Sequence, residues 1–179
     1  MSVVVANPSA SDDYFRFFGV EQKFNLDLPV LDQAYLAIQK EVHPDRHARG
    51  SDTEQRLAMQ MATFANTAFQ TLKNPVRRGL YLCQLHGVDA RLETNTAMPA
   101  AFLMKQMEWR ENLEDQDDDL GALEALAEEV DQSKRDTLVE ITQAIDVAKN
   151  YERAAELLRG LLFIDKFALE LDDAISALV

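Results

Sequence analysis

The amino-acid sequence predicts an all-α protein. Apolar residues recur at spacings of three and four along most of its 179 residues, which is the period of an amphipathic helix. Clean strand alternation is scarce, and the chain holds only six Gly and five Pro, the residues that most often interrupt helices. A hydrophobic content of 47% supports a buried core. We therefore expect two helical domains, residues 11–87 and 99–179, joined by a linker at 88–98.

The N-terminal part contains two amphipathic segments that predict an antiparallel helix pair. The first pattern runs from Leu31 to Val42 and the second from Leu57 to Leu72, each with its apolar residues on one face. Between them lies the tripeptide His43-Pro44-Asp45. Because proline lacks an N–H and disfavours helical geometry at the preceding residue, the first helix should stop here. An imidazole and a carboxylate are thus held at the start of a loop between two helices, where functional groups concentrate.

A third helix should follow the pair directly. Asn74-Pro75 ends the second pattern, and proline is favoured in the first turn of a helix. This helix should end at His86-Gly87, which is a C-cap pattern. The only cysteine, Cys83, lies among apolar neighbours and predicts a buried inert thiol, with a reactive thiol as the alternative.

The net charge of −13 is distributed unevenly. Residues 1–90 hold nine Lys and Arg against ten Asp and Glu, whereas residues 91–179 hold nine against twenty-one. Only residues 40–78 are mildly basic, with seven basic and four acidic side chains. Since phosphate affinity depends on clustered Lys and Arg, we expect no nucleic-acid partner. The basic region either steers a docking surface toward an acidic partner or is an ordinary solvated surface.

The C-terminal part predicts an antiparallel three-helix bundle. A polar junction ends at Pro99, and three long amphipathic patterns follow it, near 99–114, 120–148 and 151–178. Short connections between long helices favour antiparallel neighbours. The acidic stretch at 114–119 lacks the alternating ligands and central glycine of a calcium loop, so we interpret it as a solvated turn.

The first of these three helices carries two separate apolar faces. At about 100° per residue, three core candidates fall within about 40° of one another, namely Phe102, Trp109 and Leu113. A second set lies roughly 150° away and combines apolar with acidic side chains: Leu103, Met104, Met107, Glu108 and Glu111. A Met-rich stripe of this kind predicts an interaction surface, with packing on the N-terminal domain or on another helix of the bundle as the alternative. On the last helix, Phe163 lies off the main apolar stripe and has the same two interpretations.

Four segments of the first part together resemble a J-domain in order and spacing. They are a short helix candidate at 13–20, the helix pair, the tripeptide in its connecting loop, and residues 66–72. The resemblance implies that His43, Pro44 and Asp45 contact the ATPase domain of a heat-shock chaperone and promote ATP hydrolysis. It also implies that three nearby basic residues help to dock the loop: Lys40, Arg46 and Arg49.

Three further segments, at 81–87, 101–111 and 162–166, resemble the HscB family of J-proteins. That resemblance implies a non-enzymatic co-chaperone without a cofactor. Its J-domain would engage the specialised chaperone HscA, and its C-terminal three-helix domain would bind the iron–sulfur scaffold protein IscU. The scaffold-binding positions implied for this chain are Leu103, Met104, Met107, Glu108, Glu111 and Phe163.

Two alternatives remain beside this interpretation. One is a J-domain co-chaperone with a different client. The other is a metal-dependent hydrolase that uses His43, Asp45 and His47 as ligands, since histidine and carboxylate at such spacing can bind zinc or iron. No apolar run approaches the roughly 18 residues of a membrane span, and residues 1–11 lack the features of a signal peptide. We therefore expect a cytoplasmic protein with no membrane partner.

Overall fold

The computed structural model describes residues 13–42, 51–90, 98–116 and 118–179, and every regular element in these ranges is a helix. The predicted all-α class is confirmed. The chain divides into two compact units, Met1–Arg78 and Gly79–Val179. In chain order the elements are α1 (Tyr14–Phe18), α2 (Leu28–Val42), α4 (Asp52–Lys73), α5 (Pro75–Leu85), α6 (Ala100–Asp115), α7 (Leu120–Thr142), η1 (Gln143–Val147) and α8 (Tyr151–Ala177).

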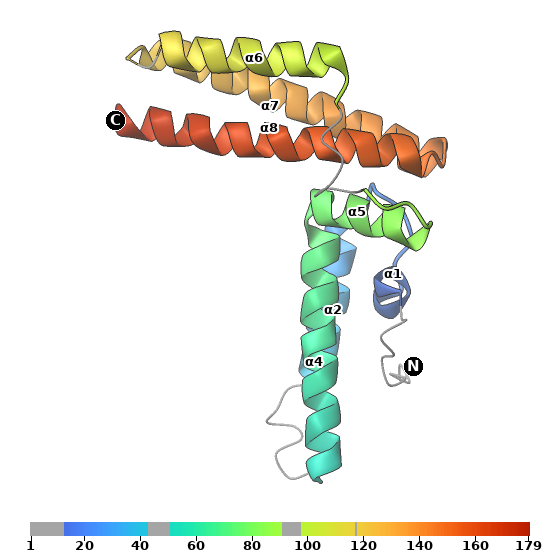
Figure 1. Cartoon of the computed structure of the whole chain (residues 1–179). Coiled ribbons are helices and arrows are strands. Elements are labelled where there is room, and N and C mark those ends of the chain that lie inside the picture. The colour runs from blue at the N-terminus through green and yellow to red at the C-terminus, as the bar shows by residue number, and fades with distance from the viewer. Residues whose placement is uncertain (1–12, 43–50, 91–97, 117) are drawn as a thin grey trace. The chain divides into compact units, whose positions relative to one another are not determined.

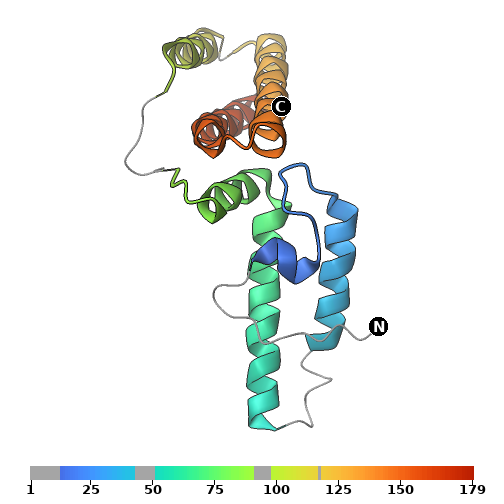
Figure 2. The same cartoon turned by 90° about the vertical axis from the view of Figure 1, so that its right-hand side faces the viewer.

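In the N-terminal unit, α2 and α4 form the predicted antiparallel pair: α2 lies behind α4 in Figure 1 and beside it in Figure 2. The ring of Tyr35 stacks on that of Phe69, with centroids 4.0 Å apart and an interplanar angle of 11°. One turn away, Lys73 Nζ lies 3.4 Å from Asp32 Oδ1. An exposed ion pair contributes little, so the stacked rings and the buried face of α4 account for most of the pairing.

The ends of the helices follow the local sequence. Ser51 and Glu54 form a capping box at the start of α4: Ser51 Oγ accepts the Glu54 N–H at 3.3 Å, and Glu54 Oε2 accepts the Ser51 N–H at 2.7 Å. Helix α4 ends at Lys73 and α5 opens at Pro75, as predicted. Gly87 has a φ of 77°, which is the left-handed conformation expected at the predicted C-cap.

The C-terminal unit is a bundle of α6, α7 and α8, seen nearly along α6 and α8 in Figure 2. Trp109 is 1% exposed and lies at the centre of its core. Its Nε1–H donates to Glu129 Oε1 at 2.9 Å, and its ring stacks on Phe167 with centroids 5.6 Å apart. Phe102 and Leu113 pack against the same core, so the predicted inward face of α6 is confirmed.

Contacts between α6 and α8 establish that these two helices run in the same direction. Gly160 lies against Phe102, since a Cβ at Gly160 would be 3.5 Å from Cζ of Phe102. Trp109 stacks on Phe167 seven residues further along both helices. Helix α7 therefore runs antiparallel to both, as in an up-down-up bundle.

The predicted helix near 120–148 is not uniform. Its α-helical part ends at Thr142 and continues as the π-helical turn η1. The N–H of Ala148 donates to the carbonyl of Gln143 at 2.9 Å, five residues back. This wider turn buries Ala144 and Ile145 but leaves Ala148 exposed, so the apolar stripe predicted through Ala148 is wrong at that residue.

Replacing Leu123 by Ala should destabilise the C-terminal unit by about 2–5 kcal/mol, because Leu123 is fully buried in the core around Trp109. Trp109 is the only tryptophan, so its fluorescence during urea unfolding reports on this unit directly. The exposed Met104 of α6 provides a matched control, and Met104→Ala should change the stability by less than about 0.5 kcal/mol. Equal effects of the two substitutions would contradict the assigned core.

Cys83 should not react with iodoacetamide at pH 8 in the folded protein. Burial raises the pKa of its thiol to about 11, with Glu152 adding to the effect, and the Sγ–H donates to the Tyr151 carbonyl at 3.5 Å. In the unfolded chain the thiol has its ordinary pKa of 9.0, so this group should lower the stability of the fold as the pH rises from 9.0 to about 11. Mass spectrometry should find alkylation only after unfolding. Rapid labelling of the folded protein would contradict this prediction.

Candidate functional site

The predicted chaperone-binding loop connects α2 and α4. Helix α2 ends at Val42 and α4 begins at Asp52, so the tripeptide directly follows the last residue of α2. Lys40 lies in the last turn of α2 and is exposed. The other residues predicted for this loop, as chaperone contacts or metal ligands, lie outside the described residues: His43, Pro44, Asp45, Arg46, His47 and Arg49.

The predicted scaffold-binding residues on α6 form an exposed apolar surface. Met104 is 64% exposed, Met107 61% and Leu103 44%, although a neighbouring residue of the same helix, Trp109, is buried. Within the described part of the C-terminal unit no helix covers these three side chains. The alternative that this stripe packs inside the bundle is therefore wrong.

Phe163 of α8 lies along the seam where α6 and α8 meet. Its side chain is 43% exposed. Phe102 of α6 faces Gly160 of α8. Phe163 lies three residues after Gly160, and Lys105 lies three residues after Phe102. Because α6 and α8 run in the same direction, Phe163 falls at the level of Lys105, between Leu103 and Met107 along the helix axis. We call Leu103, Met104, Met107 and Phe163 the α6–α8 patch.

Acidic side chains border the α6–α8 patch. Glu108 and Glu111 are exposed on α6, next in the helix to the methionines. Lys105 does not neutralise them, since its Nζ lies 3.4 Å from Glu129 Oε1 on α7 and 5.4 Å from the centre of the Trp109 ring. The patch thus offers flexible apolar anchors beside carboxylates, which suits a partner with an apolar surface and basic neighbours.

One ion pair of the seam was missed by the sequence analysis. Arg110 of α6 approaches Glu170 of α8, with 3.3 Å between its Nη1 and Oε2 of the carboxylate. On α8, Glu170 comes after Phe163 and Phe167, so this ion pair lies closer to the C-terminal end of the helix than the α6–α8 patch does. No sequence signal pairs these residues, because their meeting depends on the register of α6 against α8.

No group of three or more His, Cys, Asp or Glu side chains among the described residues is arranged to hold a metal ion. In the same ranges, no helix is both long and apolar enough to cross a membrane. Neither finding covers the tripeptide loop, which lies outside those ranges.

Comparison with protein families and curated relatives gives a consistent result. Residues 98–172 match the family described as the HSCB C-terminal oligomerisation domain. A co-chaperone protein HscB homolog of Bordetella avium is 44% identical over 162 residues, which cover 90% of this chain and 96% of the relative. The homolog of Burkholderia thailandensis is 44% identical over 172 residues, covering 95% and 98% of the two chains.

Solved structures agree with the sequence relatives. The chaperone HscB from Vibrio cholerae matches with a TM-score of 0.81 and 34% identity, covering 94% of this chain and all of that one. The crystal structure of human co-chaperone protein HscB matches with a TM-score of 0.85 and 27% identity, covering 92% and 83%. Because its relatives over nearly the whole chain are co-chaperones and it shares their helical fold, this chain is a co-chaperone. The chain belongs to the HscB family.

Proposed function

We propose that the chain stimulates the ATPase of an HscA-type heat-shock chaperone and delivers an IscU-type iron–sulfur scaffold protein to it, and so promotes cluster assembly and transfer. The observation that carries the proposal is the α6–α8 patch, which exposes the side chains that the family resemblance marks as scaffold contacts. Four large apolar side chains on one surface are costly to leave in water unless a partner covers them.

We assign the two proposed binding activities to the two predicted domains. The J-domain at 11–87 would bind the chaperone, the domain at 99–179 would bind the scaffold, and residues 88–98 would link them. His43, Pro44 and Asp45 would contact the chaperone, and Lys40, Arg46 and Arg49 would help to dock the loop. A co-chaperone acts by interacting differently with two states of the chaperone, so no reaction on this chain is required. Its own contribution is to bind both partners at once.

Asp45→Ala should abolish stimulation of the chaperone. The measurement is steady-state ATP hydrolysis by the cognate HscA-type chaperone with scaffold present, and the rate should fall from the stimulated to the basal level. Asp52→Asn is the matched control, since it removes a nearby carboxylate at the first position of α4 and should retain stimulation. If neither the wild type nor either variant stimulates, the chaperone role is wrong, and the alternative with His43, Asp45 and His47 as metal ligands becomes the one to test.

Leu103→Ala combined with Met107→Ala should weaken scaffold binding by roughly tenfold or more, because truncating central apolar anchors costs over about 1 kcal/mol each. Titration calorimetry with an IscU-type scaffold measures the change in affinity. Val139→Ala removes another exposed apolar side chain of the same unit, on α7, and should leave the affinity unchanged. Full affinity in the double variant, with an unchanged circular dichroism spectrum, would show that the scaffold binds elsewhere or that the client is a different protein.

A further inference from the structure

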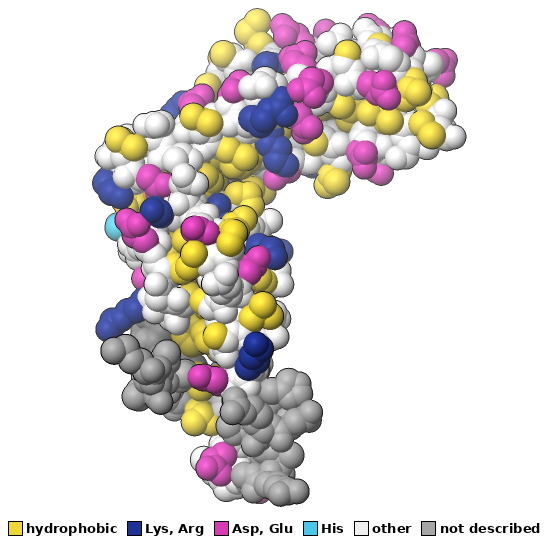
Figure 3. All heavy atoms as spheres, turned by 180° about the vertical axis from the view of Figure 1, so that it is seen from behind, with side chains coloured by type: hydrophobic (Ala, Val, Ile, Leu, Met, Phe, Trp, Pro, Cys, Tyr) yellow, Lys and Arg dark blue, Asp and Glu magenta, His cyan; other side chains and the backbone are white. Residues whose placement is uncertain are grey.

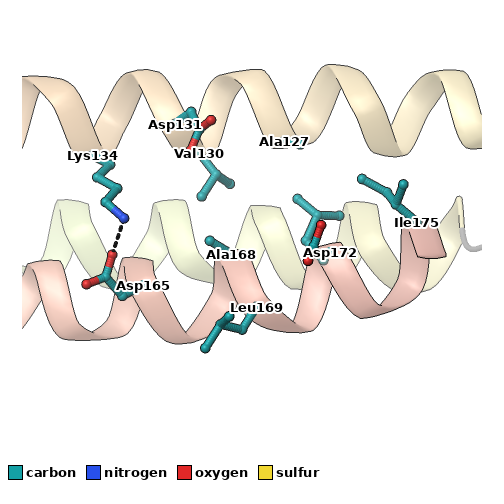
Figure 4. Close-up of a pocket in the computed structure, with 10 residues that line it drawn as sticks. Ala127, Val130, Asp131, Lys134, Asp165, Ala168, Leu169, Asp172 and Ile175 are labelled. Carbon is teal, nitrogen blue, oxygen red and sulfur yellow. Dashed lines mark ion pairs between the residues drawn. The ribbon is translucent and has the colours of Figure 1, made fainter.

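A second apolar feature of the C-terminal unit is a groove of about 460 Å³ between α7 and α8. It lies on the side of the bundle away from α6. Glu129, which contacts α6 through Trp109 and Lys105, is two residues from both Ala127 and Asp131 of the groove, and two residues turn a helix by about 200°. Figure 4 views the groove from this open side, with α6 behind it.

The groove is open because the side chains in it are small. Ala127 of α7 and Ala168 of α8 face it where bulkier residues would fill the space between the helices. Val130 and Ile175 supply further apolar lining. Leu169 at the edge is 67% exposed, which is high for a leucine beside an apolar groove. A hollow with this lining is suited to receiving apolar side chains from a partner.

The rim of the groove is acidic. Asp131 lines it on α7 and Asp172 on α8, and neither carboxylate is in an ion pair within the described ranges. Lys134 of α7 is the only basic lining residue, and its Nζ lies 2.6 Å from Oδ1 of Asp165 on α8. Three acids against one paired base leave a net negative rim. Figure 3, which views the molecule from behind, shows acidic side chains bordering hydrophobic ones on this unit.

The length of the groove fits a short helix. Its lining on α8 extends from Asp165 to Ile175, which at about 1.5 Å per residue spans roughly 15 Å, or about three helical turns. An additional helix lying between α7 and α8, opposite α6, would complete a four-helix arrangement, whose packing rules the present three helices already follow.

We propose that the α7–α8 groove binds a basic amphipathic helix of a partner protein, with apolar residues against Ala127 and Ala168 and Lys or Arg beside Asp131 and Asp172. A second copy of this chain is disfavoured as the occupant, because residues 91–179 carry a net charge of −12 and two acidic rims would repel each other. This surface is separate from the α6–α8 patch, and the inference does not depend on the proposed function.

The test uses a fluorescein-labelled synthetic helix of Leu and Lys at amphipathic spacing, with fluorescence anisotropy on the full chain at low salt. Asp131→Asn combined with Asp172→Asn should raise the dissociation constant about fivefold or more and reduce its dependence on salt. Leu169→Ser should weaken binding by about fivefold through lost apolar contact. Both changes are at exposed positions, and an unchanged urea midpoint verifies the fold.

Matched controls determine whether the groove is the site. Glu114→Gln with Asp115→Asn removes two exposed charges at the end of α6, and Val139→Ser removes an exposed apolar side chain of α7 outside both apolar surfaces, so both variants should bind the peptide as the wild type does. An equal loss in either control, full binding in both groove variants, or equal binding of a Leu and Glu peptide would overturn the proposal. Self-association in sedimentation equilibrium that Leu169→Ser abolishes would also overturn it, by showing a second copy in the groove.

Discussion

Burial of Trp109 is the interaction on which the exposed apolar surface of the C-terminal unit depends. Its indole donates to Glu129 of α7 and stacks on Phe167 of α8, so one side chain fixes α6 against both of its neighbours. Because an α-helix is rigid, placing one side chain in the core sets the direction in which every other side chain of that helix points. With Trp109 inside, Met104 and Met107 must lie on the opposite side. The exposure of the α6–α8 patch is therefore a consequence of core packing, and not of any preference of methionine for solvent.

The N-terminal unit has a simpler constraint, which is the antiparallel packing of α2 on α4. Phe64 makes T-shaped contacts with two rings of α1, with centroids 5.5 Å from Tyr14 and 4.9 Å from Phe17, while Tyr35 stacks on Phe69. Aromatic pairs of this kind are worth about 0.5–1.5 kcal/mol each beyond the area they bury. They hold α1 and the middle of α2 against the C-terminal half of α4. The loop that carries the tripeptide is thus attached at both ends to one rigid pair of helices.

Local sequence predicts the individual helices better than it predicts the contacts between them. The ends of α4 and α5 and the inward face of α6 were predictable, because caps, proline and helical periodicity act within a few residues. Periodicity also put the methionines on a second face of α6, but it left open whether that face is exposed, because exposure depends on what packs against the helix. The register of α6 against α8 was not predictable, since it depends on the close approach of Phe102 to Gly160. The turn η1 and the hollow beside Ala168 were also missed, because both arise from how two long helices fit together.

The two exposed apolar surfaces of the C-terminal unit differ in shape, and this difference constrains their use. The α6–α8 patch projects exposed side chains that are suited to entering a partner's surface, whereas the α7–α8 groove is recessed over alanines and is suited to receiving a partner's side chains. Phe163 of the patch and Asp165 of the groove are two residues apart on α8, which puts them about 200° apart around the helix. Helix α8 therefore separates the two surfaces. A partner bound to one does not cover the other, so the bundle has room for two different contacts at the same time.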